Sequence, residues 1–88
     1  MTDLKEALKI AKMNSEEDNL VEAYENEDNY IFIFMKEAVE TMNDGTAIAV
    51  GKKNGSVKEL FGQEMGVEIN VKESKEIPLE EINGMNLF

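Results

Sequence analysis

Apolar residues near the start of the chain recur with the period of an α-helix. They stand at i, i+3, i+4 and i+7, which gives a helix with one buried stripe formed by Leu4, Ala7, Leu8 and Ala11. Thr2 is the expected N-cap, and acids follow in the first turn, where the helix dipole favours them. The pattern predicts an N-terminal helix that ends near Met13 and Asn14, before a polar connection at 15–18.

Two strand-like segments follow, separated by a polar tip. Residues 19–25 are mostly apolar and are interrupted by Glu22, residues 30–35 are rich in β-branched and aromatic side chains, and Asn26–Asn29 supplies turn formers between them. We therefore expect an antiparallel hairpin. The run from Tyr30 to Met35 is apolar on both faces, so its strand should be central in a sheet and covered on both sides.

A second hairpin is predicted by the strongest local signal in the chain. Asn54-Gly55 lies between the strand-like segments 46–50 and 57–61. Asn and Gly both tolerate positive φ, so the pair favours a type I′ turn. The segment before this hairpin, Lys36–Gly45, fits either a short helix or an ordered loop.

The last third of the chain carries weaker signals. Gly62–Gly66 reads as a break, and Val67, Ile69 and Val71 then alternate with polar residues, which predicts a half-buried strand. Pro78–Ile82 suits a helical turn with proline at its first position. We expect Gly84 to end that turn and Met85–Phe88 to form an apolar tail.

Together these elements predict one α+β domain over residues 1–88. The expected fold is an N-terminal helix packed on a four- to five-stranded antiparallel sheet, followed by a short C-terminal helical turn. Two outcomes are open for the second face of the central strand. Either the Met35–Met42 segment and the C-terminal turn cover it, or it pairs with a partner or with another subunit, which would give a homodimer.

The net charge of the chain limits the kinds of partner that it can bind. Nineteen acids against nine lysines and no arginine give a net charge of −10, which disfavours nucleic acid and anionic membrane surfaces. The excess of acids lies in residues 1–35 and 62–88. The longest apolar run, Tyr30–Met35, is far below the roughly 20 residues of a membrane span, and no signal peptide is evident. We therefore expect a soluble cytoplasmic protein.

The residue types for most enzymatic chemistry are missing. The chain has no histidine and no cysteine, which removes histidine bases, thiolate nucleophiles and the commonest metal ligands. Its three serines, Ser15, Ser56 and Ser74, fall in expected turns or loops. We expect no catalytic activity and no cofactor.

Two loop sequences resemble ligand-binding motifs only superficially. Asn26–Asn29 and Asn43–Thr46 offer oxygen atoms, but neither has the spacing of a calcium loop, so turn chemistry explains them. Gly51–Ser56 contains glycine, lysine and serine in the wrong order for a phosphate-binding loop. We expect no metal site.

The acidic surface is the sequence feature with functional content. It suggests docking to a basic protein partner, through the acids Glu16, Glu17, Asp18, Glu22, Glu25, Glu27 and Asp28. Two alternatives stay open: the acidity serves only solubility, or the chain is a structural or regulatory module that associates with itself.

The second hairpin also carries a resemblance. The segment 46–57, with Lys53-Asn54-Gly55-Ser56-Val57 as its turn, resembles the K-x-G-x-V hairpin of small bacterial immunity domains from polymorphic toxin systems. In those domains the hairpin follows an N-terminal helix and an aromatic strand, as Leu4–Ala11 and Tyr30–Phe34 do here. The resemblance covers residues 1–61 in element order, and it implies a non-catalytic, toxin-neutralising binder. Those families typically carry tryptophan in the aromatic strand, which this chain lacks, and PepSY-type domains share a similar hairpin pattern.

Overall fold

The computed structural model describes residues 2–15, 19–35 and 46–83. It has the expected α+β architecture, with an N-terminal helix, a five-stranded antiparallel sheet and short C-terminal helical turns. In chain order the elements are α1 (Leu4–Asn14), β1 (Asn19–Glu25), β2 (Asn29–Met35), β3 (Thr46–Gly51), β4 (Val57–Leu60), α2 (Gln63–Gly66), the π-helical turn η2 (Val67–Val71), β5 (Lys75–Glu76) and α3 (Leu79–Asn83).

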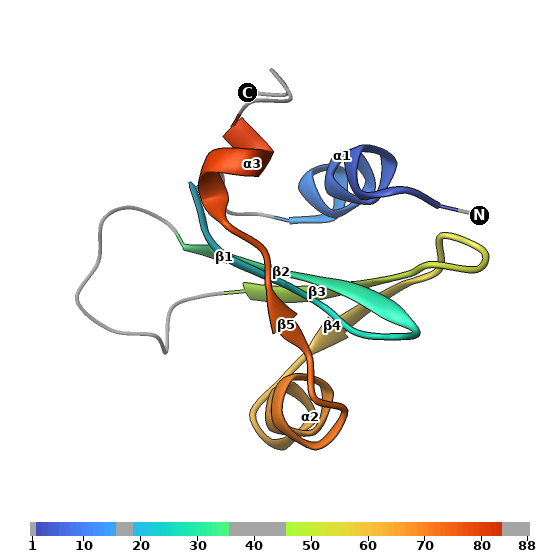
Figure 1. Ribbon diagram of the computed structural model, residues 1–88, viewed down its shortest axis with the longest axis vertical. Helices are drawn as coiled ribbons and strands as arrows, with labels where there is room; N and C mark the ends of the chain where they lie inside the picture. Colours follow the sequence, from blue (N-terminus) through green and yellow to red (C-terminus); the bar gives the residue numbers. More distant parts are fainter. Residues whose placement is uncertain (1, 16–18, 36–45, 84–88) are drawn as a thin grey trace.

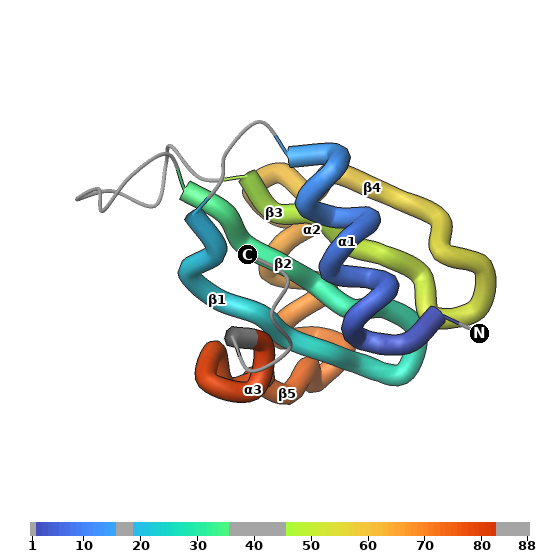
Figure 2. Tube along the Cα trace, turned by 90° about the horizontal axis from the view of Figure 1, so that it is seen from above, coloured from blue at the N-terminus to red at the C-terminus, as the bar shows by residue number. Residues whose placement is uncertain are grey.

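The sheet has the strand order β4-β3-β2-β1-β5, and every neighbouring pair is antiparallel (Figure 2). The expected central position of β2 is confirmed. Phe32 stands between Ala23 of β1 and Ile48 of β3 in the register, and all three are buried. The β1–β2 register shifts between Leu20 and Glu22, which marks a bulge near the start of β1.

Helices α1 and α3 cover one face of the sheet (Figure 1). Phe32 and Phe34 of β2 point to this face, where they pack with the buried stripe of α1 and with Ile82 of α3. The stripe is the one expected from the helical period, and its members Ala7, Leu8 and Ala11 are fully buried. The longer apolar side chains of β2 and the small alanines of α1 allow the helix to lie close to the sheet.

The start of α1 differs from expectation by one residue. Asp3, rather than Thr2, is the N-cap, and its Oδ1 accepts a hydrogen bond of 2.8 Å from the backbone N–H of Glu6. Thr2 is buried instead, and its backbone N–H donates to the carbonyl of Lys52 at 2.7 Å. The tertiary contact with the β3–β4 loop therefore decides which of two suitable residues caps the helix.

The second face of the sheet is covered by residues 63–71, which lie on the opposite side from α1 in Figure 1. Met65 and Ile69 pack against a second cluster that includes Ile31 and Ile33 of β2. The half-buried strand predicted around Ile69 is wrong: η2 is helical, with the backbone N–H of Lys72 bonded to the carbonyl of Val67 at 3.1 Å. Burial of the sheet face outweighs the strand propensity of the alternating valines.

The predicted hairpin between β3 and β4 is present, but its turn is not type I′. Gly55 has φ 71°, whereas Asn54 does not have the positive φ that a type I′ turn requires. The loop is longer: the N–H of Gly51 bonds to the carbonyl of Ser56, and the N–H of Gly55 bonds to the carbonyl of Gly51. The side chain of Asn54 accepts from the N–H of Ser56 at 3.0 Å.

The C-terminal part of the described chain returns to β1. Ile77 is buried, and its N–H donates to the carbonyl of Ala23 at 2.8 Å, before Pro78 leads into α3. The expected helical turn after Pro78 is thus confirmed. The predictions for Lys36–Gly45, including the covering role of Met35–Met42 beyond Met35, and for the tail from Gly84 onward lie outside the described residues. Within the described residues, no helix has the length and apolar character needed to cross a membrane.

Candidate functional site

An acidic segment from each acidic end of the chain lies at one edge of the sheet. Strand β5 pairs antiparallel with β1, so Glu76 lies opposite Tyr24 and Lys75 lies opposite Glu25. Figure 1 shows β5 beside β1, with α3 continuing from it over the sheet. The acids from residues 19–28 and from residues 68–81 therefore form one surface, which we call the acidic half; it comprises β1, the β1–β2 tip, η2, β5 and α3.

Tyr24 lies between acids of both segments. Its hydroxyl donates to Glu22 Oε2 at 2.9 Å. Burial, this hydrogen bond and the negative charges of Glu22 and Glu76 together raise the pKa of Tyr24 to about 12. Burial is the largest of these causes, and the carboxylates of Glu22 in β1 and Glu76 in β5 add to it.

The structure separates the seven acids predicted as a partner-binding set. Glu16, Glu17 and Asp18 lie outside the described residues. Glu22 accepts from Tyr24, and Glu25 forms an ion pair of 3.0 Å with Lys52. Asp28 lies 3.7 Å from the Nζ of Lys72.

Glu27 is the remaining member of the predicted set. It is exposed at the β1–β2 tip and forms no ion pair with another described residue. Lysines distant in sequence therefore neutralise part of the expected docking surface. That pairing could not be foreseen from the local pattern.

Four further acids belong to the same half and were missed by the sequence-based prediction. They are exposed, they form no ion pair with any described residue, and they come from the segment after η2: Glu73, Glu76, Glu80 and Glu81. The acidity of residues 62–88 is a signal in the sequence. Its position beside β1 follows only from the β1–β5 pairing.

Asn26 holds the two segments of the acidic half together. Its Oδ1 accepts from the backbone N–H groups of Asp28 and Asn29, both at 2.8 Å, which closes the β1–β2 tip. Its Nδ2 donates to Glu68 Oε2 at 3.0 Å and to Ser74 Oγ at 3.1 Å. Asn26 is only 7% exposed, so these bonds satisfy a buried amide and attach the tip to η2.

Glu68 is the charged partner in this network. Burial alone would raise its pKa, but hydrogen bonds from Lys72, Asn26 and Asn29 outweigh burial and hold the pKa below its usual value. Lys72 Nζ lies 3.0 Å from Glu68 Oε1, and this contact raises the pKa of Lys72. Glu68 is therefore a structural carboxylate that remains charged at neutral pH.

A shallow hollow of about 410 Å³ lies beside this network at the end of the sheet. Its charged lining combines both signs and consists of Glu25, Glu27, Lys52, Lys72, Glu73 and Lys75, with Asn26 as the neutral member. Lys52 also lies 4.9 Å from the ring centroid of Tyr30. The hollow is thus a mixed-charge region inside a surface that is acidic as a whole.

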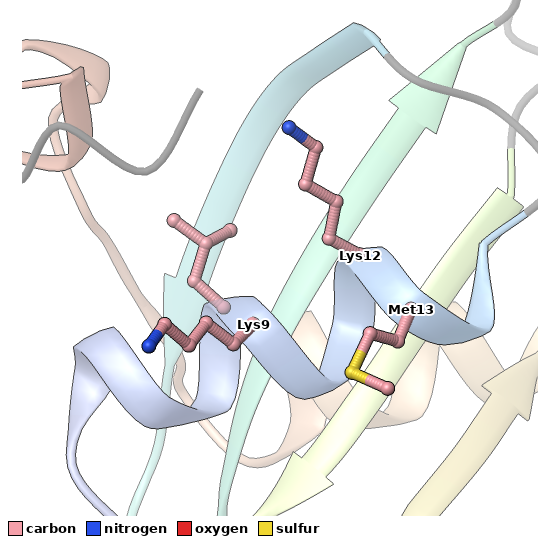
Figure 3. A pocket seen from close by; sticks show the side chains of 4 residues that line it. Lys9, Lys12 and Met13 are labelled. Atoms are coloured by element: carbon pink, nitrogen blue, oxygen red, sulfur yellow. The ribbon is translucent and has the colours of Figure 1, made fainter.

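The opposite half of the sheet has a different charge. Among the described residues, the acidic half holds nine acids and three lysines, a net −6, when Lys52 is counted with its partner Glu25. The half built from α1, the β3–β4 hairpin and α2 holds four acids and five lysines, a net +1. A hollow of about 240 Å³ beside α1 is lined by Leu8, Lys9, Lys12 and Met13, whose side chains project from the helix (Figure 3).

The net negative charge of the acidic half attracts positively charged groups. Within residues 2–15, 19–35 and 46–83, no group of three or more acidic side chains is placed to hold a metal ion. Comparison of the chain with protein-family models, with curated proteins and with solved structures finds no match in any of the three.

Proposed function

We propose that this chain is a non-catalytic binding protein that captures a basic protein partner through its acidic half. The observation that carries the proposal is the separation of charge across the sheet: among the residues that the structure describes, one half with Lys52 holds nine acids and three lysines, and the other half is nearly neutral. A local excess of one sign accelerates the encounter with an oppositely charged partner and orients it.

The acids outside the lysine pairs are the proposed contact residues. Five exposed acids form no ion pair with another residue of the described segments, so their charge is available to a partner: Glu27, Glu73, Glu76, Glu80 and Glu81. Glu16, Glu17 and Asp18 immediately precede β1 in the chain, and the proposal includes them. In this mechanism, electrostatic steering is followed by occlusion of the partner's functional surface, as for an immunity or inhibitor protein.

Self-association through an open sheet face has less support. That alternative needs an apolar face of β2 that the chain leaves uncovered. Ala7, Leu8 and Ala11 pack on one face, and Met65 and Ile69 pack on the other.

The test compares two double variants that change the net charge equally. Glu76→Gln with Glu80→Gln alters the acidic half, and Glu6→Gln with Glu64→Gln alters the other half. The tagged wild-type chain first captures its partner from a lysate of the native host at low and moderate salt. Association with the purified partner is then measured for each variant.

We expect one stoichiometric basic partner that is lost as salt rises. Association should slow about threefold to tenfold for the acidic-half variant and much less for its control, because only the former reduces the steering field. Charge reversal at Glu16, Glu17 and Asp18 should weaken association further. Salt-independent binding, or equal loss in both double variants, would contradict the proposal.

A further inference from the structure

The edge strand β4 carries a second feature that the acidic half does not explain. β4 is the outer strand on the side of the sheet opposite β5 (Figure 2). Val57 pairs with Val50 of β3, and Glu59 pairs with Ile48. An outer strand has one row of backbone groups that no neighbouring strand uses.

The register identifies which backbone groups point outward. The N–H of Gly51 donates to the carbonyl of Ser56 at 2.8 Å, so this opposed pair is hydrogen-bonded. Bonded and non-bonded pairs alternate along an antiparallel ladder. Lys58 and Leu60 therefore bond to β3, whereas the N–H and C=O groups of Val57 and Glu59 point away from it. No other described residue bonds to these four groups.

The side chains of Val57 and Glu59, with Phe61 after the strand, give this edge two exposed apolar groups and one exposed acid. Val57 is 41% exposed and Phe61, directly after the strand, is 64% exposed. Glu59 stands between them, exposed and without an ion pair to any described residue. Lys58 points to the opposite face, where it is paired with Glu64 at 2.9 Å.

Charge argues against a second copy of this chain as the occupant. A two-fold antiparallel pairing that uses the outward groups of Val57 or Glu59 has three registers. One places Val57 opposite its own equivalent and Glu59 opposite Gly55, but Gly55 has a φ of 71° and its N–H already donates to the carbonyl of Gly51, so it cannot extend the ladder. Of the other two, one places Lys58 opposite Lys58 of the second copy, and the other places Glu59 opposite its own equivalent. Like charges directly opposite each other destabilise a sheet.

We propose that β4 binds an extended segment of another protein, which adds to the sheet as a sixth, antiparallel strand. The segment carries a lysine or arginine opposite Glu59, flanked two positions away by apolar side chains that contact Val57 and Phe61. Backbone hydrogen bonds supply the affinity, and the alternating side chains supply the selectivity. This surface is separate from the acidic half, so the two proposals can fail independently.

The test uses a short blocked peptide with a central lysine, valines two positions to either side and threonines between. Nuclear magnetic resonance of the isotope-labelled chain follows the amides of Val57 and Glu59 during titration. We expect saturable shifts centred on β4 and slower hydrogen exchange of these two amides. The Glu59→Lys variant should bind roughly fivefold more weakly, and a peptide with central glutamate should also bind more weakly.

Val57→Pro tests the backbone contribution. Proline is tolerated at the first residue of an edge strand whose N–H faces solvent, so the fold should remain while one outward donor is lost. Thermal unfolding checks that the variant folds. A peptide N-methylated at its pairing amides removes the same bonds and leaves the protein unaltered, which keeps the test valid if the proline variant unfolds.

Three results would overturn the proposal. The first is no saturable shift at a peptide concentration of about 1 mM. The second is binding that neither Val57→Pro nor N-methylation weakens. The third is a set of shifts confined to β1, β5 and α3, which would show that the peptide is attracted only by the acidic half.

Discussion

The buried amide of Asn26 donates a hydrogen bond to the carboxylate of Glu68, 3.0 Å away and 42 positions later in the chain. This bond joins the β1–β2 tip to the helical segment that covers the second face of the sheet. Asn26 also closes the tip through the N–H groups of Asp28 and Asn29. One side chain therefore links a local turn to a long-range contact.

Asn26→Ala should destabilise the fold by about 2–3 kcal/mol, because it leaves two tip N–H groups and Glu68 without their partner. Urea unfolding measures the change. Asn14→Ala is the matched control: the amide of Asn14 makes one exposed hydrogen bond to the carbonyl of Ile10, so the loss should stay within about 0.5 kcal/mol. Equal losses would show that Asn26 is not a structural link.

Acid should weaken the fold through Glu68. Its pKa in the folded chain lies below the ordinary value of 4.5, so its contribution is present above that pH and is lost as the pH falls through the folded pKa. Glu68→Gln should lower stability at neutral pH and flatten the acid-dependent decline seen in urea unfolding. Lys72→Met should partly flatten the same acid-dependent decline in stability, because it removes one of the groups that stabilise the charged Glu68. A decline as steep in Glu68→Gln as in the wild type would refute this role.

Tyr24 should lose its proton at an unusually high pH. In a Tyr30→Phe background it is the single tyrosine, and its ultraviolet absorbance should report a pKa of about 12. Because the folded pKa is raised from 10.0, this group's contribution to stability is complete below pH 10 and is lost as the pH rises through the folded value. Glu76→Gln should lower the pKa, since it removes a nearby negative charge. A midpoint near 10 in the folded chain would contradict the described geometry.

Substitutions in η2 distinguish its helical form from the strand predicted by the sequence. Ile69→Ala should destabilise the fold by about 1–2 kcal/mol, because Ile69 packs against the second cluster. Val71→Ala should change stability by less than about 0.5 kcal/mol, because Val71 is 72% exposed. In a half-buried strand the two side chains would share the buried face, so similar losses in thermal unfolding would favour the strand.

A glycine in place of Glu73 should stabilise the fold. Its φ of 52° lies in the left-handed region, where a side chain carries a conformational cost, and it directly follows Lys72, the C-cap of η2. Glu73→Gly should stabilise the fold by about 0.5–1 kcal/mol in urea unfolding. Glu76→Gly, in β5 and without positive φ, should destabilise it. A loss of stability in both variants would argue against the left-handed conformation at Glu73.

Local patterns determined most of the elements. The helical period of Leu4–Ala11 and the doubly apolar run Tyr30–Met35 each describe one segment that must bury a particular face, so α1 and the central place of β2 followed from the sequence alone. The composition likewise set the net charge and removed histidine and cysteine chemistry from consideration. These properties depend on residues close together in the chain.

Tertiary structure decided the features that depend on distant partners. Val67, Ile69 and Val71 alternate as a strand does, yet they form η2 because the second face of β2 needs a cover. The acids of the two chain ends form one surface only because β5 pairs with β1, and Lys52 and Lys72 neutralise Glu25 and Asp28 from far along the chain. Such contacts are set by burial and electrostatics across the whole domain, which no local pattern encodes.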